Sequence, residues 1–168
     1  MITLVLGGAR SGKSAMAERL VAQLPPPVTY VATGVIGDDA DLARRVEVHR
    51  RRRPATWRTV EAGPDLEGAL AAAPGTVMVD SLGMWVAATW DSSSGRLKAD
   101  LATLCQALES RSGDTVVVSD EVGLGVHPFS EAGRRFRDVL GVVNQAVAER
   151  SDRVLLVVAG RALPLDRV

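Results

Sequence analysis

The chain has 168 residues, of which 46% are hydrophobic, and its 20 lysines and arginines balance 20 aspartates and glutamates. This length and composition predict a single domain over residues 1–168 with a substantial core. The net charge of zero argues against a protein drawn to nucleic acid or to an anionic membrane surface, and it favours a small-molecule partner.

Two further features bear on cellular location. The single cysteine, Cys105, cannot form an internal disulfide, and we expect it to pack on an apolar helix face. The first residues, MITLVLGGARSGK, place no basic segment before an apolar core, and their apolar run is too short for a membrane span. We therefore expect a cytoplasmic protein without a signal peptide or a membrane span.

Short apolar, β-branched runs alternate with segments of helical periodicity. The runs predict strands at 2–6, 28–32, 76–80, 115–120 and 153–159, and because they are apolar throughout, they indicate a parallel sheet buried on both faces. The segments between them predict helices at 13–24, 39–52, 64–73, 97–109 and 131–149, and residues 90–96 predict a surface loop. This alternation indicates a three-layer α/β/α sandwich with a mainly parallel sheet, whose active site lies beyond the carboxyl ends of the strands.

The first predicted strand is followed directly by GGARSGKS, which has the spacing of a phosphate-binding P-loop. Its residues are Gly7, Gly8, Ala9, Arg10, Ser11, Gly12, Lys13 and Ser14. The glycines let the backbone fold around a phosphate, Lys13 adds a mobile cation, and the Ser14 hydroxyl can ligate Mg²⁺. The placement between a buried strand and a helix is the context that the motif requires, so we expect a P-loop NTPase fold of the RecA-like kind. The motif alone fixes neither the base nor the reaction.

Acidic residues end two later strands. Asp80 closes VMVD at the carboxyl edge of a predicted strand, where it could hold Mg²⁺ or a water bound to the ion. Asp120 and Glu121 close VVVSDE in a similar way. The alternative for each is a carboxylate that caps the next turn or helix. We expect Ser14 and Asp80 to hold the metal.

His49 lies among arginines in DLARRVEVHRRRRPATW. One interpretation is the solvated face of a basic helix that ends before Pro54, with the histidine incidental. The other is chemical, because a neutral imidazole can attack an activated phosphorus while guanidinium groups stabilise the phosphoryl oxygens and keep the imidazole neutral. A nucleic-acid patch is a third interpretation, which the zero net charge and the few aromatic residues disfavour.

Six segments in a fixed order span nearly the whole chain. They are GGARSGKS, YVATG, RRVEVHRRRRPATWRTVE, VDSLGMW, VSDEVGLGVHP and FRDVLGVVNQAVAERSDRVLLVVAG. In order and spacing they resemble the adenosylcobinamide kinase/adenosylcobinamide-phosphate guanylyltransferase family of cobalamin biosynthesis. The resemblance implies two reactions: ATP or GTP phosphorylates the hydroxyl of the aminopropanol arm of adenosylcobinamide, and GMP then passes from GTP to that phosphate, giving adenosylcobinamide-GDP and pyrophosphate.

The resemblance also implies roles for particular residues. His49 matches the histidine that carries the guanylyl group, and Lys13, Mg²⁺ and the arginines would stabilise charge. Matches to positions that the family associates with nucleotide are residues 7–14, Ala32, Thr33, Gly34, Arg50, Arg51, Arg52, Arg53, Glu61 and Asp80. A homotrimer is implied as well. Asn144 and Gln145 lie on a predicted helix, where their amides either pack at a subunit contact or bridge to substrate.

Three places depart from the family pattern. Asp120 stands where the family commonly has asparagine, Ser81-Leu82-Gly83 replaces a more usual Cys-Leu-Thr, and His127 replaces an aliphatic residue. We expect His127 to be an ordinary loop histidine beside Pro128. Two other functions stay open on the residues alone: a P-loop kinase of another small alcohol, which would not need His49, and a nucleotide-dependent switch protein.

Overall fold

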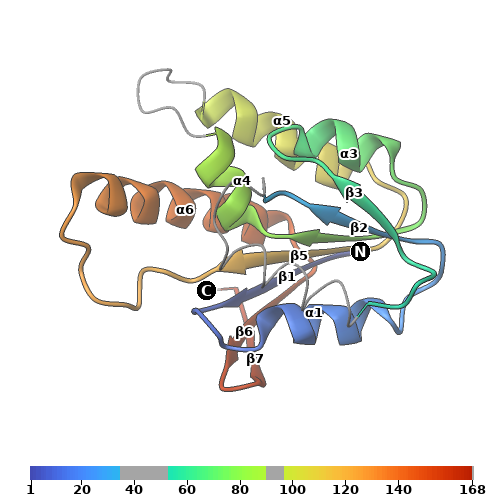
Figure 1. Cartoon of the computed structure of the whole chain (residues 1–168), viewed down its shortest axis with the longest axis horizontal. Helices are drawn as coiled ribbons and strands as arrows, with labels where there is room; N and C mark the ends of the chain where they lie inside the picture. Colours follow the sequence, from blue (N-terminus) through green and yellow to red (C-terminus); the bar gives the residue numbers. More distant parts are fainter. Residues whose placement is uncertain (35–52, 90–96, 168) are drawn as a thin grey trace.

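Parallel strands form the centre of the molecule (Figure 1). The computed structural model describes residues 1–34, 53–89 and 97–167. Within these ranges one sheet has the strand order β3-β2-β4-β5-β1-β6-β7. The strands are β1 (Ile2–Gly7), β2 (Val28–Ala32), β3 (Arg58–Glu61), β4 (Thr76–Asp80), β5 (Thr115–Asp120), β6 (Arg153–Val158) and β7 (Arg161–Leu165). All neighbours pair in parallel except β7, which runs antiparallel to β6.

Helices cover both faces of this sheet. The described helices are α1 (Lys13–Val21), α3 (Leu66–Ala72), α4 (Leu82–Thr89), α5 (Leu97–Glu109) and α6 (Glu131–Arg150). Figure 1 shows α1 below the sheet and α3, α4, α5 and α6 above it. The helices and the sheet therefore make the three layers that the alternating sequence pattern predicts.

The core divides into two apolar clusters, one on each face of the sheet. Leu4 of β1 belongs to the cluster with Trp85 and Leu140, under the helices of the upper layer. Val5, the next residue, belongs to the cluster with Ala17 of α1. Successive residues of a strand point to opposite faces, so a strand with both faces covered is apolar at most positions, and its few buried polar residues carry small hydroxyl side chains, as at Thr3 and Ser119. This explains the continuous apolar runs in the sequence.

The five predicted strands are all present; the first extends by one residue to Gly7, and the last ends at Val158 rather than at residue 159. The predicted helices 13–24 and 64–73 are shorter in the structure, as Lys13–Val21 and Leu66–Ala72, because turns follow Val21 and the side chain of Asp65 caps Gly68 N. The prediction for 97–109 is confirmed, and the prediction for 131–149 extends by one residue. The predicted helix 39–52 and the predicted loop 90–96 lie outside the described residues.

Sequence inspection missed three elements. Helix α4 is apolar around most of its circumference, so it lacks the amphipathic period that identifies a surface helix. Strand β3 is short and mostly polar, and β7 is exposed throughout and contains Pro164. Proline and polar residues are tolerated at the edges of a sheet, where no further strand needs the backbone donor.

Arg111 ties together the amino ends of two central strands. Its guanidinium donates to the carbonyl of Leu70, to that of Ala73 at 2.9 Å and to that of Gly75 at 2.7 Å. Its Nε donates to Thr115 Oγ1 at 3.1 Å, at the start of β5. Burial lowers the pKa of Arg111, but arginine stays charged in proteins, so these bonds are charge-assisted.

Candidate active site

The carboxyl ends of the central strands bring the candidate residues to one edge of the sheet. Gly7 at the end of β1 lies beside Asp120 at the end of β5. Ala32 at the end of β2 lies between Asp80 of β4 and Glu61 of β3. Ligands of parallel α/β sheets bind at this edge, because the loops that follow the strands converge there. The strand order thus places these predicted residues along one edge, including the exposed Glu61.

The P-loop follows β1 and leads into α1. A Cβ on Gly7 would collide with Ser11 Oγ, and Gly12 has a left-handed backbone with φ 94°, which glycine adopts without strain. Gly12 is also the N-cap of α1 and offers no side chain to the first backbone N–H groups of the helix. Those N–H groups, at the positive end of the helix dipole, form the kind of cradle that binds phosphate. Ser14 lies in the first turn of the same helix.

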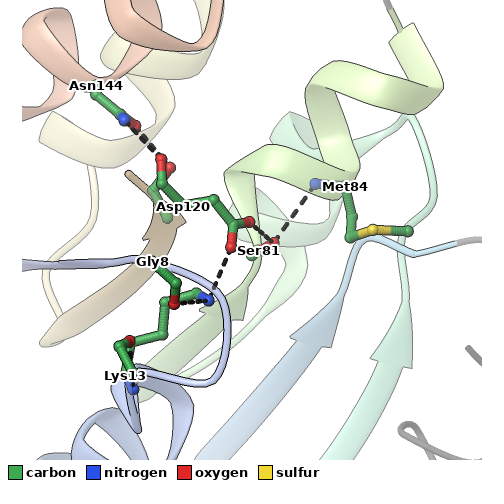
Figure 2. Close-up of polar contacts among 8 residues, drawn as sticks. Gly8, Lys13, Ser81, Met84, Asp120 and Asn144 are labelled. Carbon is green, nitrogen blue, oxygen red and sulfur yellow. Dashed lines mark hydrogen bonds and ion pairs between the residues drawn. The ribbon is translucent and has the colours of Figure 1, made fainter. Parts of the chain in front are cut away.

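Lys13 reaches back across the P-loop toward the end of β5 (Figure 2). Its Nζ lies 2.7 Å from Asp120 Oδ1 and donates to the Gly8 carbonyl at 3.4 Å. The side chain of Lys13 is 13% exposed and that of Asp120 is 30% exposed. The predicted cation of the site is therefore paired with a carboxylate from a distant part of the sequence.

The surroundings of Asp120 come from three elements (Figure 2). The Ser81 hydroxyl donates to Asp120 Oδ2 at 3.4 Å, and Asn144 Nδ2 of α6 donates to the Asp120 carbonyl at 3.0 Å. The other end of that amide accepts from Ser119 Oγ at 2.6 Å. Asn144 is 7% exposed and bonded on both sides, so within this chain its amide supports the end of β5. Its burial is thus explained without the subunit contact or the bridge to substrate that the sequence suggested.

Tyr30 connects Asp80 with Arg53. The tyrosine hydroxyl donates to Asp80 Oδ2 at 3.0 Å, and the Arg53 guanidinium lies 3.6 Å from the centre of the ring. Burial, followed by the nearby Asp80 charge, raises the pKa of Tyr30. Trp57, which follows Arg53 and Pro54 in the same motif, packs against the apolar cluster that contains Tyr30. Sequence inspection missed Tyr30. The only signal in the sequence was a polar phenol within an otherwise apolar predicted strand, and the pairing of that strand with the strand of Asp80 became visible only in the structure.

Thr33 has a structural role that the sequence did not reveal. Its side chain is fully buried, donates to the Ser81 carbonyl at 2.6 Å and accepts from Ser81 N at 2.9 Å. These two bonds join the end of β2 to the turn between β4 and α4. Gly34 follows it, and a Cβ there would lie 3.3 Å from Met84 Cε.

Several other sequence predictions have definite outcomes. Cys105 is 3% exposed, as expected for a packing thiol. His127 lies exposed in the loop before α6, with its Nδ1 2.9 Å from an Arg137 nitrogen. His49, Arg50, Arg51 and Arg52 lie outside the described residues, so the structure does not say where they are.

The oxygen ligands of the predicted metal fit a hard cation such as Mg²⁺ in their chemistry. Asp80 supplies a carboxylate at the end of β4, and Ser14 supplies a hydroxyl in the first turn of α1. No group of three or more His, Cys, Asp or Glu side chains with metal-binding spacing occurs in residues 1–34, 53–89 and 97–167. A hydroxyl and a carboxylate would suit Mg²⁺, which takes few protein ligands because it keeps several waters and binds substrate phosphates.

Comparison with known proteins assigns the fold. The chain is similar to the flagellar accessory protein FlaH of Methanocaldococcus jannaschii, with a TM-score of 0.52 at 11% identity, over 98% of this chain and 77% of that one. It is also similar to an ATPase from the type III secretion system of pathogenic bacteria, with a TM-score of 0.52 at 13% identity, over 92% of this chain and 50% of that one. The α/β P-loop fold expected from the sequence is confirmed. In the described part of the chain, no helix combines the length and the apolar character that crossing a membrane requires.

Sequence comparison assigns the family. The chain is 43% identical to the bifunctional adenosylcobalamin biosynthesis protein CobP of Pseudomonas aeruginosa, over 98% of this chain and 97% of that protein. It is 38% identical to the bifunctional adenosylcobalamin biosynthesis protein CobU of Escherichia coli, over 95% of this chain and 97% of that protein. A family model described as cobinamide kinase / cobinamide phosphate guanyltransferase matches residues 3–165. The chain therefore belongs to the cobinamide kinase / cobinamide phosphate guanyltransferase family.

Proposed function

We propose that this protein phosphorylates adenosylcobinamide with ATP or GTP and then transfers GMP from GTP to the new phosphate. The observation that carries the proposal is the P-loop after β1, with Lys13 beside Asp120 and with Asp80 along the same edge of the sheet. Family membership supplies the substrate class. Both reactions are displacements at phosphorus, so one triphosphate site with positioned cations serves both.

In the kinase step, the P-loop backbone and Lys13 would hold the terminal phosphates. The hydroxyl oxygen of adenosylcobinamide forms a bond to the γ-phosphorus, the bond from that phosphorus to the bridging oxygen breaks, and the hydroxyl proton is released. Mg²⁺, held by Ser14 and Asp80, would supply charge neutralisation at the phosphates. Tyr30 supports this arrangement, because its hydroxyl donates to one oxygen of Asp80.

In the guanylyl step, a nitrogen of His49 would attack the α-phosphorus of GTP and pyrophosphate would leave. An oxygen of adenosylcobinamide phosphate then attacks the same phosphorus, the P–N bond breaks, and adenosylcobinamide-GDP forms. Arg50, Arg51, Arg52 and Arg53 would stabilise the phosphoryl oxygens. The position of Arg53 over Tyr30, which is bonded to Asp80, supports a role for this segment near the nucleotide.

We further propose a cytoplasmic homotrimer. Three large apolar side chains lie in the loop between β5 and α6: Leu124 is 80% exposed, Val126 is 88% exposed and Phe129 is 98% exposed. Apolar side chains this exposed favour burial against another surface, which supports an assembly. A cytoplasmic location supplies the nucleoside triphosphates that both reactions consume.

Covalent labelling tests the proposal. Purified protein is incubated with Mg²⁺ and GTP labelled at either the α or the γ phosphorus, and the denatured protein is examined on a gel. We expect the protein to retain the α label alone, in an acid-labile form, because a phosphoramidate is hydrolysed by acid. His49→Ala should abolish the label.

The matched control is His127→Ala, since the chain has two histidines and His127 lies in an exposed loop. This variant should retain the α label. If wild-type protein binds GTP but never retains the α label, the covalent mechanism is wrong and a plain kinase remains. Activity toward adenosylcobinamide, followed as transfer of the γ label, tests the kinase step separately.

A further inference from the structure

The lysine of a P-loop normally directs its ammonium group toward the triphosphate. In this structure the ammonium of Lys13 forms an ion pair with Asp120. The Lys13 ammonium lies 2.7 Å from Asp120 Oδ1, and the Lys13 side chain is largely covered. An ion pair at this distance, partly shielded from water, is stronger than one on an open surface. The same ammonium cannot pair fully with both the carboxylate and a phosphate.

The fold holds the Asp120 carboxylate where it meets Lys13. Its second oxygen accepts a hydrogen bond from the Ser81 hydroxyl at 3.4 Å, and Asn144 anchors its backbone carbonyl at 3.0 Å. The pairing of Gly7 with Asp120 fixes the P-loop strand and this residue side by side. Asp120 is thus a residue built into the site rather than a surface charge that Lys13 meets by chance.

Gly83 provides the space for this arrangement. A Cβ at Gly83 would collide with Asp120 Oδ2, and the next nearest atoms would be Cγ and Cβ of the same side chain. An alanine at this position would therefore displace the Asp120 carboxylate rather than the backbone. The absence of a side chain at Gly83 lets the carboxylate lie against the start of α4.

We propose that Asp120 is a positioning residue that holds the Lys13 ammonium in the nucleotide-free protein and must release it when a triphosphate binds. The inference rests on the proposed function, because it takes the P-loop as the triphosphate site. Binding then requires breaking the Lys13–Asp120 pair, and it leaves a carboxylate near the negatively charged phosphates. Asp120 lowers nucleotide affinity on both grounds, and this makes the release of nucleotide after transfer easier.

The direction in which the Kd for nucleotide changes in Asp120→Asn distinguishes this role from a purely structural one. In Asp120→Asn the amide keeps the size of the side chain but no longer holds the ammonium as an ion pair. We expect the Kd for nucleotide to fall about tenfold, which corresponds to one partly buried charge pair. A residue that merely supports the fold would have the opposite effect, since its loss would raise the Kd.

The experiment is an equilibrium titration with the α,β-methylene analogue of GTP, which cannot donate GMP, in the presence of Mg²⁺. The matched control is Glu109→Gln, which removes one negative charge and one ion pair, with Arg150, at the end of α5 far along the chain from the P-loop. Its Kd should equal that of the wild type. An unchanged or higher Kd for Asp120→Asn would overturn the inference.

Gly83→Ala gives an independent arm of the same test. It should lower the Kd in the wild-type background by displacing the carboxylate, and it should have no effect in the Asp120→Ala background, where nothing is left to displace. An equal effect in both backgrounds would contradict the proposed contact. Thermal unfolding of each variant checks that the protein is folded.

Lys13→Ala distinguishes failure of the inference from failure of the proposed function. If wild type binds the analogue and Lys13→Ala binds much more weakly, the P-loop is the site and the Asp120 variants decide the inference alone. If wild type does not bind, or Lys13→Ala binds as well as wild type, the proposed triphosphate site itself is wrong.

Discussion

Tyr30 shows how one buried side chain supports two parts of the proposed site. Its hydroxyl donates to Asp80, and its ring lies under the Arg53 guanidinium. Asp80 is the proposed metal ligand, and Arg53 belongs to the segment that contains the proposed nucleophile. The tyrosine therefore fixes the direction of a carboxylate while giving an arginine an aromatic surface on which to stack.

Tyr30→Phe separates these two contributions, because it removes the hydroxyl and keeps the ring. In this variant Asp80 loses the hydrogen bond that the tyrosine hydroxyl donates to its charged carboxylate. A hydrogen bond to a charged group is worth about 1.5–3 kcal/mol. We expect the Mg²⁺ concentration that gives half-maximal kinase rate to rise at least severalfold. The measurement is the γ-phosphoryl transfer rate as a function of Mg²⁺ at saturating nucleotide. An unchanged Mg²⁺ requirement would show that Tyr30 does not orient the metal ligand.

The same tyrosine predicts how stability depends on alkaline pH. Tyr30 is the only tyrosine of the chain, and burial raises its pKa above the ordinary value of about 10. Above that pH the unfolded chain loses the phenol proton while the folded chain keeps it, so stability falls as pH rises. We expect tyrosinate absorbance to increase only as the protein unfolds. Reversible ionisation near pH 10 with intact tertiary structure would contradict this.

Helices and strands were predictable where burial imposes a regular pattern on the sequence. The runs at β1 and β5 are buried along nearly their whole length because helices cover both faces, so most of their residues are apolar, and this made them recognisable. Helix α4 contributes Trp85 and Val86 to the core, but its exposed residues, such as Ala87, are apolar too, so its sequence lacks the period that would have identified it. Strand β7 carries exposed residues and a proline because it lies at an edge, so its sequence resembles a loop.

We expect Arg111 to stabilise the fold by linking the ends of neighbouring elements. It bonds the end of α3 and the turn before β4 to the first residue of β5. Arg111→Ala leaves several partly buried carbonyls without a donor, so we expect the free energy of unfolding to fall by about 2–4 kcal/mol. Urea denaturation measures this change.

The control for Arg111 is Arg135→Ala on α6. Arg135 is half exposed and forms an i,i+4 pair with Glu131 at 3.5 Å, which contributes about 0.3–0.5 kcal/mol at most. Equal losses for the two variants would show that the bonds made by Arg111 contribute little. Nucleotide affinity should be unchanged in both variants, because neither residue touches the P-loop strand ends.

The side-chain contacts that could not be predicted from the sequence depend on the order of the strands in the sheet. The sequence predicts that Asp80 and Asp120 end strands at the edge that holds the P-loop. It does not say that β5 lies directly beside β1, and that adjacency is what brings Asp120 within 2.7 Å of Lys13. The link from Tyr30 to Asp80 likewise depends on the pairing of β2 with β4. Local patterns predicted the elements and the motif, whereas these pairings arise from tertiary packing.

The proposed assembly is tested by the exposed loop before α6. We expect wild-type protein to have a mass in solution of about three times the 17.8 kDa of one chain, and Phe129→Asp to reduce it by placing a charge in an apolar contact. Light scattering after gel filtration measures the mass. Val142→Asp, at another exposed apolar position on α6, is the matched control and should keep the assembled mass. A wild-type mass of one chain would rule out the trimer.

The strand order also has a consequence for how the protein is made. β1 precedes the other described strands in the chain, but its two partners, β5 and β6, are synthesised only after β2, β3 and β4. During synthesis, the P-loop that follows β1 therefore lacks both neighbouring strands of β1 until β5 and β6 have been made. Contacts between such distant segments slow folding and leave apolar strands exposed in the meantime. The nucleotide cradle is thus completed by strands that are synthesised long after the cradle's own residues.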